Sequence, residues 1–227
     1  MTHILAIGDC NTSGIKEFPE DNIGNALVTA LQEKGHPATL TNTAQAMYTT
    51  REGLNHARLI TEKADILLLN FGLVDAWITS IPNLYVLYFP TNPLRKFFRK
   101  ILKSFKKRIR HPAFQKFIPR GNVVPLPEYL DNMRAIIALI RRNSPDIHII
   151  IWNTPPTQSN LERNEAIRHY NAALKDLTRK LDTTYIDTET LFKSHKTEDI
   201  YLDEVHITKT AQAMLARHIV EKIEPEA

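Results

Sequence analysis

Cys10 is the single cysteine of the 227-residue chain and lies in a polar turn directly after an apolar run at residues 4–7. The turn reads Gly8-Asp9-Cys10-Asn11-Thr12-Ser13-Gly14. If the run is a strand and a helix follows it, the thiol lies among free backbone N–H groups, which favour a thiolate. We therefore expect Cys10 to be a nucleophile. The alternative is a small buried residue, which is the more common role of a lone cysteine.

A second pair of reactive residues lies near the other end of the chain, within Asp203-Glu204-Val205-His206. A spacing of three lets the carboxylate of Asp203 fold back in a turn and orient the imidazole of His206. Such a pair supplies a general base and the residue that orients it. The alternative is a helix cap followed by a surface histidine. One domain contains both the thiol and this pair, at its opposite ends. The presence of the two motifs together favours a shared site more than either motif does alone.

Apolar runs alternate with helical patterns and predict the elements that position these residues. The runs end in polar loops, which is where ligands bind in open α/β sheets. We predict an α/β fold, a three-layer α/β/α sandwich with a mainly parallel, flavodoxin-like five-stranded sheet. The predicted strands are residues 4–7, 38–40, 65–70, 147–152 and 184–187, and the predicted helices are residues 22–34, 50–63, 128–142, 161–181 and 208–223.

Length and composition predict one domain spanning residues 1–227, with 43% hydrophobic and 24% charged residues. No stretch approaches the roughly 20 apolar residues that cross a bilayer. The N-terminus has no basic region before its first strand, unlike a signal peptide, and a lone thiol is easiest to keep reduced in the cytosol. We therefore expect a cytoplasmic protein. The nine histidines show no ligand-type spacing, so we expect no metal and no cofactor.

Residues 94–110 contain nine Lys or Arg and no acidic residue. The rest of the chain holds 20 basic and 25 acidic residues, a net charge of −5, so we expect no nucleic-acid partner. Apolar residues at 94, 97, 98, 101, 102, 105 and 109 form one stripe of a helix, in a basic helical insertion at about 76–126. This pattern is typical of an interfacial helix on an anionic membrane surface, or of a docking surface for an acyl carrier protein. The alternative is a core-packed helix with a solvated basic face.

The two reactive motifs resemble blocks of the SGNH (GDSL-like) hydrolase superfamily. Residues 4–14 are similar to its first block, Gly-Asp-Ser-x-Thr-x-Gly, with Cys10 at the serine. Residues 201–215 resemble its last block, Asp-x-x-His-Leu-Thr followed by a helix. The resemblance covers the chain from end to end. It implies that Cys10 is the nucleophile, His206 the general base and Asp203 the residue that orients His206.

The middle blocks depart from the superfamily pattern. Residues 42–51 resemble the second block, but the oxyanion-hole glycine falls near Met47, whose backbone N–H can still serve. Residues 70–75 resemble the third block, Gly-x-Asn-Asp, with Gly72 at its glycine and Val74 at the oxyanion-hole asparagine. Removing one oxyanion donor typically costs about a hundredfold or more in rate.

Two asparagines are candidates to replace the missing donor. Asn70 and Asn153 each follow a predicted strand, so both should lie on loops at the same edge of the sheet. Together with Met47 and Gly72, at positions matched by the resemblance, Asn70 and Asn153 make up the expected oxyanion or substrate-binding group. The alternative role for the two asparagines is turn formation.

These features predict an esterase, thioesterase or acyltransferase that uses a Cys-His-Asp triad. A thiolate needs less help from its base than a hydroxyl, so the loss of one oxyanion donor is more tolerable. The thioester intermediate is open to water, alcohols and amines. The variant Gly-x-Val-Asp block is similar to a subset of the superfamily linked to surface polysaccharides, which implies a saccharide or other small-molecule acyl ester, or lipid-linked metabolism. Cys10 is otherwise an engineered replacement of serine, or the remnant of a site in a non-catalytic binding or scaffold protein.

Overall fold

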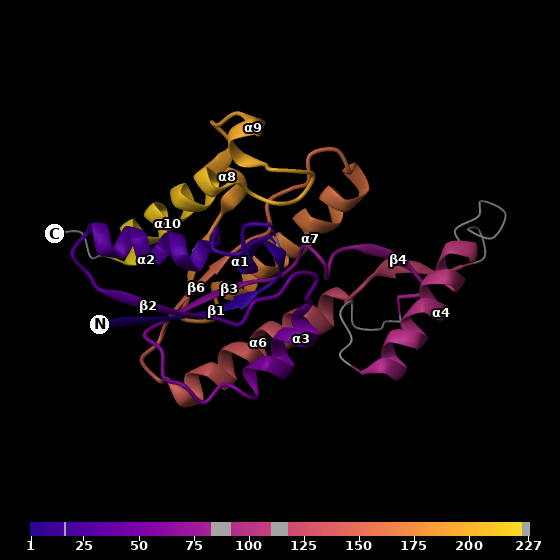
Figure 1. The fold of residues 1–227 in the computed structure, drawn as a ribbon, viewed down its shortest axis with the longest axis horizontal. Coiled ribbons are helices and arrows are strands. Elements are labelled where there is room, and N and C mark those ends of the chain that lie inside the picture. The colour runs from indigo at the N-terminus through magenta and orange to yellow at the C-terminus, as the bar shows by residue number, and fades with distance from the viewer. Residues whose placement is uncertain (16, 83–91, 110–117, 224–227) are drawn as a thin grey trace.

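The central sheet of the computed structural model has five parallel strands (Figure 1), and the structure describes residues 1–15, 17–82, 92–109 and 118–223. The strands are β1 (Thr2–Gly8), β2 (Ala38–Asn42), β3 (Ile66–Asn70), β6 (His148–Trp152) and β7 (Thr184–Ile186), in the order β2-β1-β3-β6-β7. This is the flavodoxin-like order, in which successive strands move first to one side of β1 and then to the other. The predicted fold class is confirmed.

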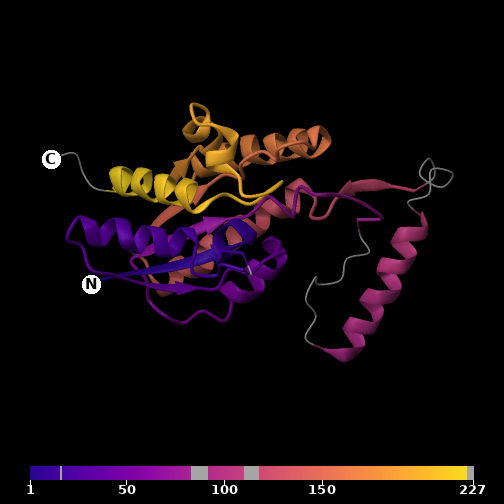
Figure 2. The ribbon, with the colours of Figure 1, turned by 45° about the horizontal axis from the view of Figure 1, so that its top comes forward.

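Helices cover both faces of the sheet because side chains alternate between the faces along each strand. On one face, Leu67, Leu69 and their strand neighbours pack against α3 (Thr50–Ala57), α6 (Leu126–Asn143) and α7 (Leu161–Thr178). On the other face, Leu68 and its neighbours pack against α2 (Ile23–Glu33), α8 (Thr188–Phe192), α9 (Thr197–Ile200) and α10 (Lys209–Ile223). Helices α2 and α10 lie side by side there (Figures 1 and 2).

Helix α3 is shorter than the predicted helix over residues 50–63, because it ends at Ala57. The next residues are held by the C-terminus of α6. Asn143 donates its side-chain N–H to the carbonyl of Ile60 at 2.6 Å, and Ser144 accepts the backbone N–H of Ala64 at 3.0 Å. These bonds lead the chain directly into β3, so a tertiary contact overrides the helical pattern.

A two-stranded antiparallel ribbon, β4 (Ile78–Ser80) paired with β5 (Arg120–Asn122), lies beyond the sheet. Helix α4 (Pro93–Ile109) stands to one side of the α/β body, next to this ribbon (Figures 1 and 2). Residues 83–91 and 110–117, which fall within the predicted insertion, lie outside the described residues. In the part of the chain that the structure describes, no helix is both long enough and apolar enough to cross a bilayer.

Candidate active site

Cys10 begins a single helical turn, α1 (Cys10–Ser13), at the carboxyl end of β1. Its side chain is 5% exposed. The turn is close to the neighbouring strand, because a Cβ atom on Gly8 would lie 2.6 Å from the carbonyl oxygen of Asn70 and 2.3 Å from Oγ1 of Thr12. Glycine at position 8 therefore allows the chain to turn here without separating β1 from β3.

The backbone N–H of Met47 donates to Sγ of Cys10 at 3.1 Å. Met47 has a φ of 65°, in the left-handed region that side chains other than glycine rarely adopt. The backbone therefore has, at position 47, the conformation that the superfamily resemblance assigns to a glycine. This geometry places a fixed backbone N–H donor beside the sulfur that would attack a carbonyl, close to where an oxyanion would form.

The imidazole of His206 is oriented by Asp203. Oδ2 of Asp203 lies 2.7 Å from Nδ1 of His206, and Oδ1 accepts the backbone N–H groups of Val205 and His206 at 2.8 Å each. Partial burial pushes the pKa of Asp203 upward, but these hydrogen bonds and the charge of His206 outweigh burial, so the pKa lies below its usual value. Asp203 is therefore ionised at neutral pH and directs Nε2 of His206 away from itself.

Asn11 connects the His206 segment to the turn that carries Cys10. Its side-chain oxygen accepts the backbone N–H of Ile207 at 3.1 Å, and its side-chain N–H donates to the carbonyl of Val205 at 3.2 Å. The two bonds flank His206 on both sides. Asn11 is 3% exposed, so these bonds are shielded from water. The sequence analysis did not identify Asn11, because its partners lie near the other end of the chain.

The thiol of Cys10 is held in its neutral form. Burial and the charge of Asp9 together raise the pKa of Cys10 to about 12, and the N–H of Met47 only partly offsets them. The prediction of a thiolate stabilised at a helix N-terminus is therefore wrong, because the thiol is buried and the carboxylates of Asp9 and Asp203 also oppose its ionisation. Among the described residues no hydrogen bond joins Sγ to the imidazole of His206, and Nε2 has no protein partner.

Two buried carboxylates lie beneath the site. Asp9 is fully buried and accepts the backbone N–H groups of Asn11 at 3.2 Å and Leu73 at 3.3 Å. Asp75 is also fully buried and accepts both the N–H and the hydroxyl of Thr50, at 2.9 and 2.7 Å. Burial raises the pKa of each carboxyl to about 7. The sequence analysis did not assign them a role, although both follow strands in polar loops.

The four predicted oxyanion or substrate-binding residues do not converge on the thiol. Only Met47 contacts Sγ. The side-chain N–H of Asn70 donates to the carbonyl of Trp152 at 2.8 Å, which ties the end of β3 to the end of β6. Gly72 has a φ of 139° and passes close to Thr154, since a Cβ there would lie 2.7 Å from Oγ1 of Thr154. Glycine is thus required for backbone packing at this position.

Asn153 is likewise occupied by bonds within the fold. Its side-chain oxygen accepts the N–H of Thr188 at 2.8 Å, and its side-chain N–H donates to Asp187 at 3.3 Å. Val74, at the position of the oxyanion-hole asparagine, is buried, with 4% exposure. In this arrangement the amides of Asn70 and Asn153 hold loops together at the carboxyl edge of the sheet, and the donors nearest the sulfur come from the backbone.

The chain matches the GDSL-like Lipase/Acylhydrolase family over residues 6–214. Similar solved structures include an acetylxylan esterase from Geobacillus stearothermophilus, with a TM-score of 0.64, 19% identity and coverage of 99% of this chain and 95% of that chain. A lipase/acylhydrolase from Enterococcus faecalis has a TM-score of 0.66, 16% identity and full coverage of both chains. No curated protein has a matching sequence.

The structural similarities, at these identities, show a shared fold. The family match spans both reactive motifs and every strand of the parallel sheet except the start of β1. The chain therefore belongs to the GDSL-like lipase/acylhydrolase family, the esterases and acylhydrolases of the SGNH superfamily.

Proposed function

We propose that this chain cleaves or transfers an acyl group through a covalent thioester on Cys10, with His206 as general base and Asp203 as the residue that orients it. The observation that carries the proposal is the pair of bonds from Asn11 to the residues on either side of His206, at 3.1 and 3.2 Å. They hold the base beside the turn that carries the thiol. The N–H of Met47, aimed at Sγ, supports the same assignment.

The first half of the reaction acylates the thiol. Nε2 of His206 takes the thiol proton as Sγ attacks the carbonyl carbon of the substrate. The carbonyl oxygen becomes an oxyanion, which accepts the backbone N–H groups of Met47 and of Cys10 itself. The tetrahedral intermediate then expels the alcohol or thiol, which takes the proton from His206, and a thioester remains on Cys10.

The second half returns the enzyme to its starting state. A water molecule, alcohol, amine or thiol gives a proton to Nε2 of His206 and attacks the thioester carbonyl. The intermediate breaks its C–S bond, and Sγ recovers the proton. Water gives hydrolysis, and the other acceptors give acyl transfer.

The neutral thiol favours thioester donors over alkyl esters. When Sγ attacks an alkyl ester, the intermediate holds one sulfur and one alkoxide leaving group, and the lower pKa of a thiol makes sulfur the better leaving group. The intermediate then returns to starting material more often than it goes forward. A thioester substrate offers a second sulfur leaving group, and because the pKa of Cys10 is raised to about 12, the substrate thiol leaves more readily and the acyl group passes to Cys10. Aryl esters, with acidic phenols, behave in the same way.

Intact-protein mass spectrometry tests the proposal. The wild-type chain is mixed with p-nitrophenyl acetate or an acetyl thioester, quenched in acid, and digested to locate the added acetyl group. We expect acetylation at Cys10, none in Cys10→Ala, and a strong decrease in His206→Ala. Replacing exposed His169 by alanine is the matched control and should leave acetylation unchanged. Acetylation that persists without Cys10, or that is equal in wild type and His206→Ala, would contradict the proposal and leave a binding protein with the hydrolase fold.

A further inference from the structure

Five large apolar side chains on α4 are exposed. They are Leu94, Phe97, Phe98, Ile101 and Phe105, at 65, 60, 57, 50 and 46% exposure, and together they are called the apolar stripe. A helix packed in the core would bury them, so that alternative interpretation of the segment is wrong for these residues. Soluble proteins rarely leave contiguous apolar patches of this kind without a partner.

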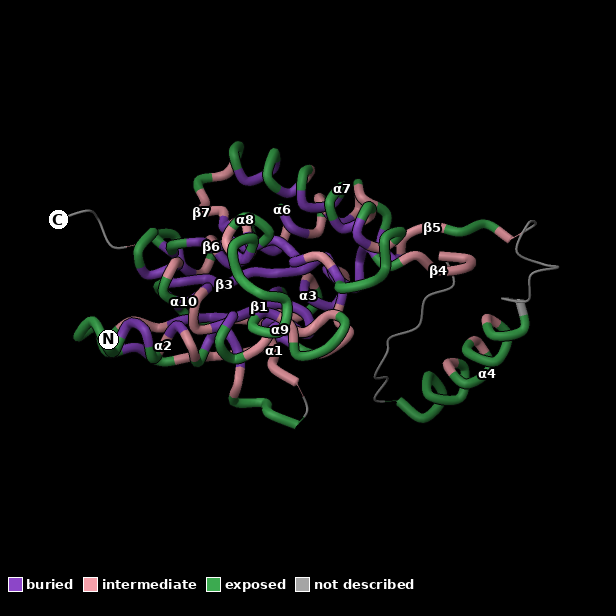
Figure 3. The backbone as a smooth tube through the Cα atoms, turned by 90° about the horizontal axis from the view of Figure 1, so that it is seen from above, coloured by how far each residue is buried: buried purple, intermediate pink, exposed green. Residues whose placement is uncertain are grey.

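The stripe lies beside the face of α4 that contacts the rest of the chain. The half-buried residues of α4 are Arg99, Leu102 and Lys106. Nζ of Lys106 donates to Oγ1 of Thr79 at 3.2 Å and to the carbonyl of Ile81 at 3.4 Å, which attaches the helix to the β4–β5 ribbon. The apolar stripe occupies a neighbouring side of the helix. Figure 3 shows α4 in the colours of exposed and half-buried residues, green and pink, and away from the purple strands of the sheet.

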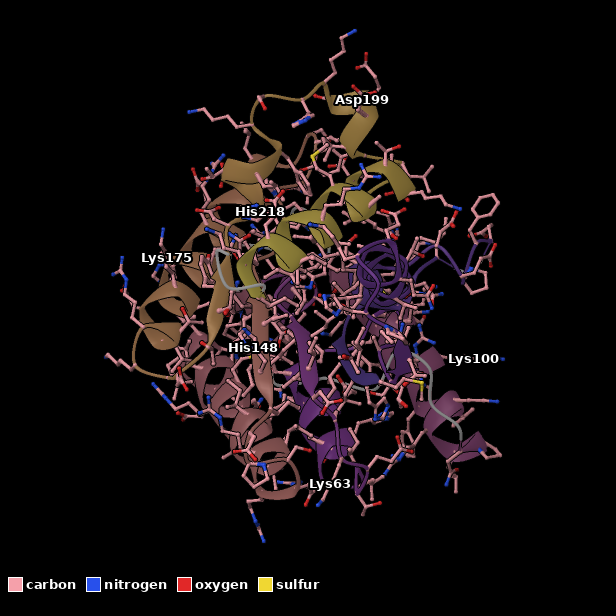
Figure 4. All side chains as sticks on the ribbon, turned by 90° about the vertical axis from the view of Figure 1, so that its left-hand side faces the viewer. Lys63, Lys100, His148, Lys175, Asp199 and His218 are labelled. Carbon is pink, nitrogen blue, oxygen red and sulfur yellow. The ribbon has the colours of Figure 1, made fainter. Side chains whose placement is uncertain are left out.

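Cations occupy the rest of the exposed surface of α4, and residues 93–109 contain no acidic residue. Figure 4 labels one of them, Lys100, on α4. The exposed cations are Arg95, Lys96, Lys100, Lys103, Lys107 and Arg108. Their long aliphatic stems let the charged ends reach a polar layer while the stripe enters an apolar one.

We propose that α4 binds an anionic membrane surface, lying flat with the apolar stripe in the acyl region and the cations among the lipid headgroups. At a rise of 1.5 Å per residue, the helix extends about 25 Å along that surface. Its stripe reaches the boundary between headgroups and acyl chains, about 5–10 Å deep, as interfacial helices do. The chain outside residues 94–110 carries a net charge of −5 and is repelled from the same surface, so the charge distribution orients the protein with α4 toward the lipid.

Charge complementarity selects lipid over a second copy of this chain. Two apolar stripes facing each other would bring two sets of cations together, and like charges in contact oppose association. An acidic protein could pair with the cations, but it would also need an apolar groove the length of the stripe. An anionic bilayer supplies negative charge and an apolar layer at the same place.

Vesicle flotation with the full chain tests the proposal. The vesicles are pure phosphatidylcholine, or phosphatidylcholine mixed with phosphatidylserine. We expect the wild-type chain to float with the anionic vesicles only, and the bound fraction to fall as salt is added. A triple charge reversal, Lys100→Glu, Lys103→Glu and Lys107→Glu, should weaken binding by about a hundredfold or more, since each cation near the surface contributes roughly a fivefold effect.

A matched control reverses three exposed lysines on other elements, Lys180→Glu, Lys193→Glu and Lys222→Glu, and gives the same net charge. We expect this control to retain most of the binding. A third variant, Phe97→Gln, Ile101→Gln and Phe105→Gln, keeps every cation and should lose binding at moderate salt. Because the substituted side chains are exposed, we expect each variant to unfold at the same thermal midpoint as the wild type, and this measurement checks that the variants are folded.

Three outcomes would overturn the proposal. In the first, the wild-type chain stays in the soluble fraction when anionic vesicles are present. In the second, the α4 charge-reversed variant and the control variant lose binding equally, and in the third, binding is unchanged after the apolar stripe is made polar. If the chain binds an acidic acyl carrier protein but does not bind vesicles, α4 is a protein-docking surface instead.

Discussion

The side-chain oxygen of Asn11 accepts the backbone N–H of Ile207 at 3.1 Å, across 196 residues of sequence. The residue after the thiol is thus bonded to the residue after the imidazole. The side-chain N–H of Asn11 also bonds to the backbone, because it donates to the carbonyl of Val205. The relative position of the two reactive side chains therefore depends on one buried amide.

Asn11→Ala should slow acetylation of Cys10 by at least about tenfold, because a catalytic group displaced by about 1 Å loses much of its effect. It should also lower the free energy of unfolding by about 1–3 kcal/mol, the cost of unpaired buried backbone groups. The rate of acetylation is measured by mass spectrometry, and stability is measured by urea unfolding.

Asn164→Ala is the matched control for this loss. The Asn164 amide is also buried, and it bonds both the N–H and the carbonyl of Thr157, at 2.6 and 2.8 Å. We expect a similar loss of stability with little change in the rate of acetylation. Equal effects on the rate from both variants would show that Asn11 acts only through general stability.

Met47→Gly should be more stable than Met47→Ala by about 1 kcal/mol. Both remove the same side-chain contacts, but alanine keeps the strain of a φ of 65° and glycine does not. Both variants keep the backbone N–H that faces Sγ, so we expect acetylation in each. Urea unfolding measures the difference, and a more stable alanine variant would show that the left-handed backbone is not maintained in solution.

The rate of iodoacetamide labelling of Cys10 should rise with pH up to at least pH 10 without a plateau. Because the pKa of the thiol is raised to about 12, the thiolate fraction increases about tenfold per pH unit throughout this range. A thiolate stabilised near neutrality would instead reach a constant rate above its pKa. Asp9→Asn should increase the rate at a given pH, since it removes the nearest charge that opposes ionisation. A plateau below pH 8 in the wild type would contradict the assigned thiol environment.

The free energy of unfolding should fall as the pH rises from about 4 to 7. Asp9 and Asp75 have pKa values raised to about 7 by burial, against 3.8 for an exposed aspartate. Between these values the folded protein keeps protons that the unfolded chain has released, so each pH unit costs up to about 1.4 kcal/mol per group. Above pH 7 the contribution becomes constant.

Urea unfolding at pH 5, 6, 7 and 8 measures this dependence. Asp75→Asn should make it shallower, because it removes one of the two groups. The exposed Asp131→Asn is the control and should leave the dependence unchanged. A wild-type stability that increases over this pH range would show that other carboxylates, stabilised when ionised, outweigh the buried pair.

The sequence predicted the five strands of the parallel sheet, and three of them, β1, β3 and β6, contain apolar runs that end in turn residues. The strands β4 and β5 were missed because they are short and mainly polar, as in Arg120–Asn122, and contain no apolar run. The family resemblance predicted the special position of Met47, which the positive φ explains. Sequence could not show that Asn11 bonds to Val205 and Ile207, because bonds of that kind depend on the folded positions of distant segments.

The environment of the thiol was also beyond the sequence. A turn before a helix suggested a stabilised thiolate, but the outcome depended on burial and on the closeness of Asp9 to Sγ. Neither the burial of the thiol nor the distance between Asp9 and Sγ follows from the fact that Asp9 precedes Cys10 in the sequence. The exposure of the apolar stripe is a similar case, because the pattern of residues 94–110 is equally suited to a buried helix and to an interfacial one.

The side-by-side packing of α2 and α10 joins helices that follow the two reactive motifs, and this determines when the site can form during protein synthesis. Cys10 is synthesised before His206 and α10, which follow it in the chain by almost 200 residues. A nascent chain with the thiol already exposed has neither its base nor the helix that completes that face of the sheet. The acyl chemistry that we propose for Cys10 therefore requires translation to proceed past α10, and a chain that ends before α10 would have a thiol without its proposed base.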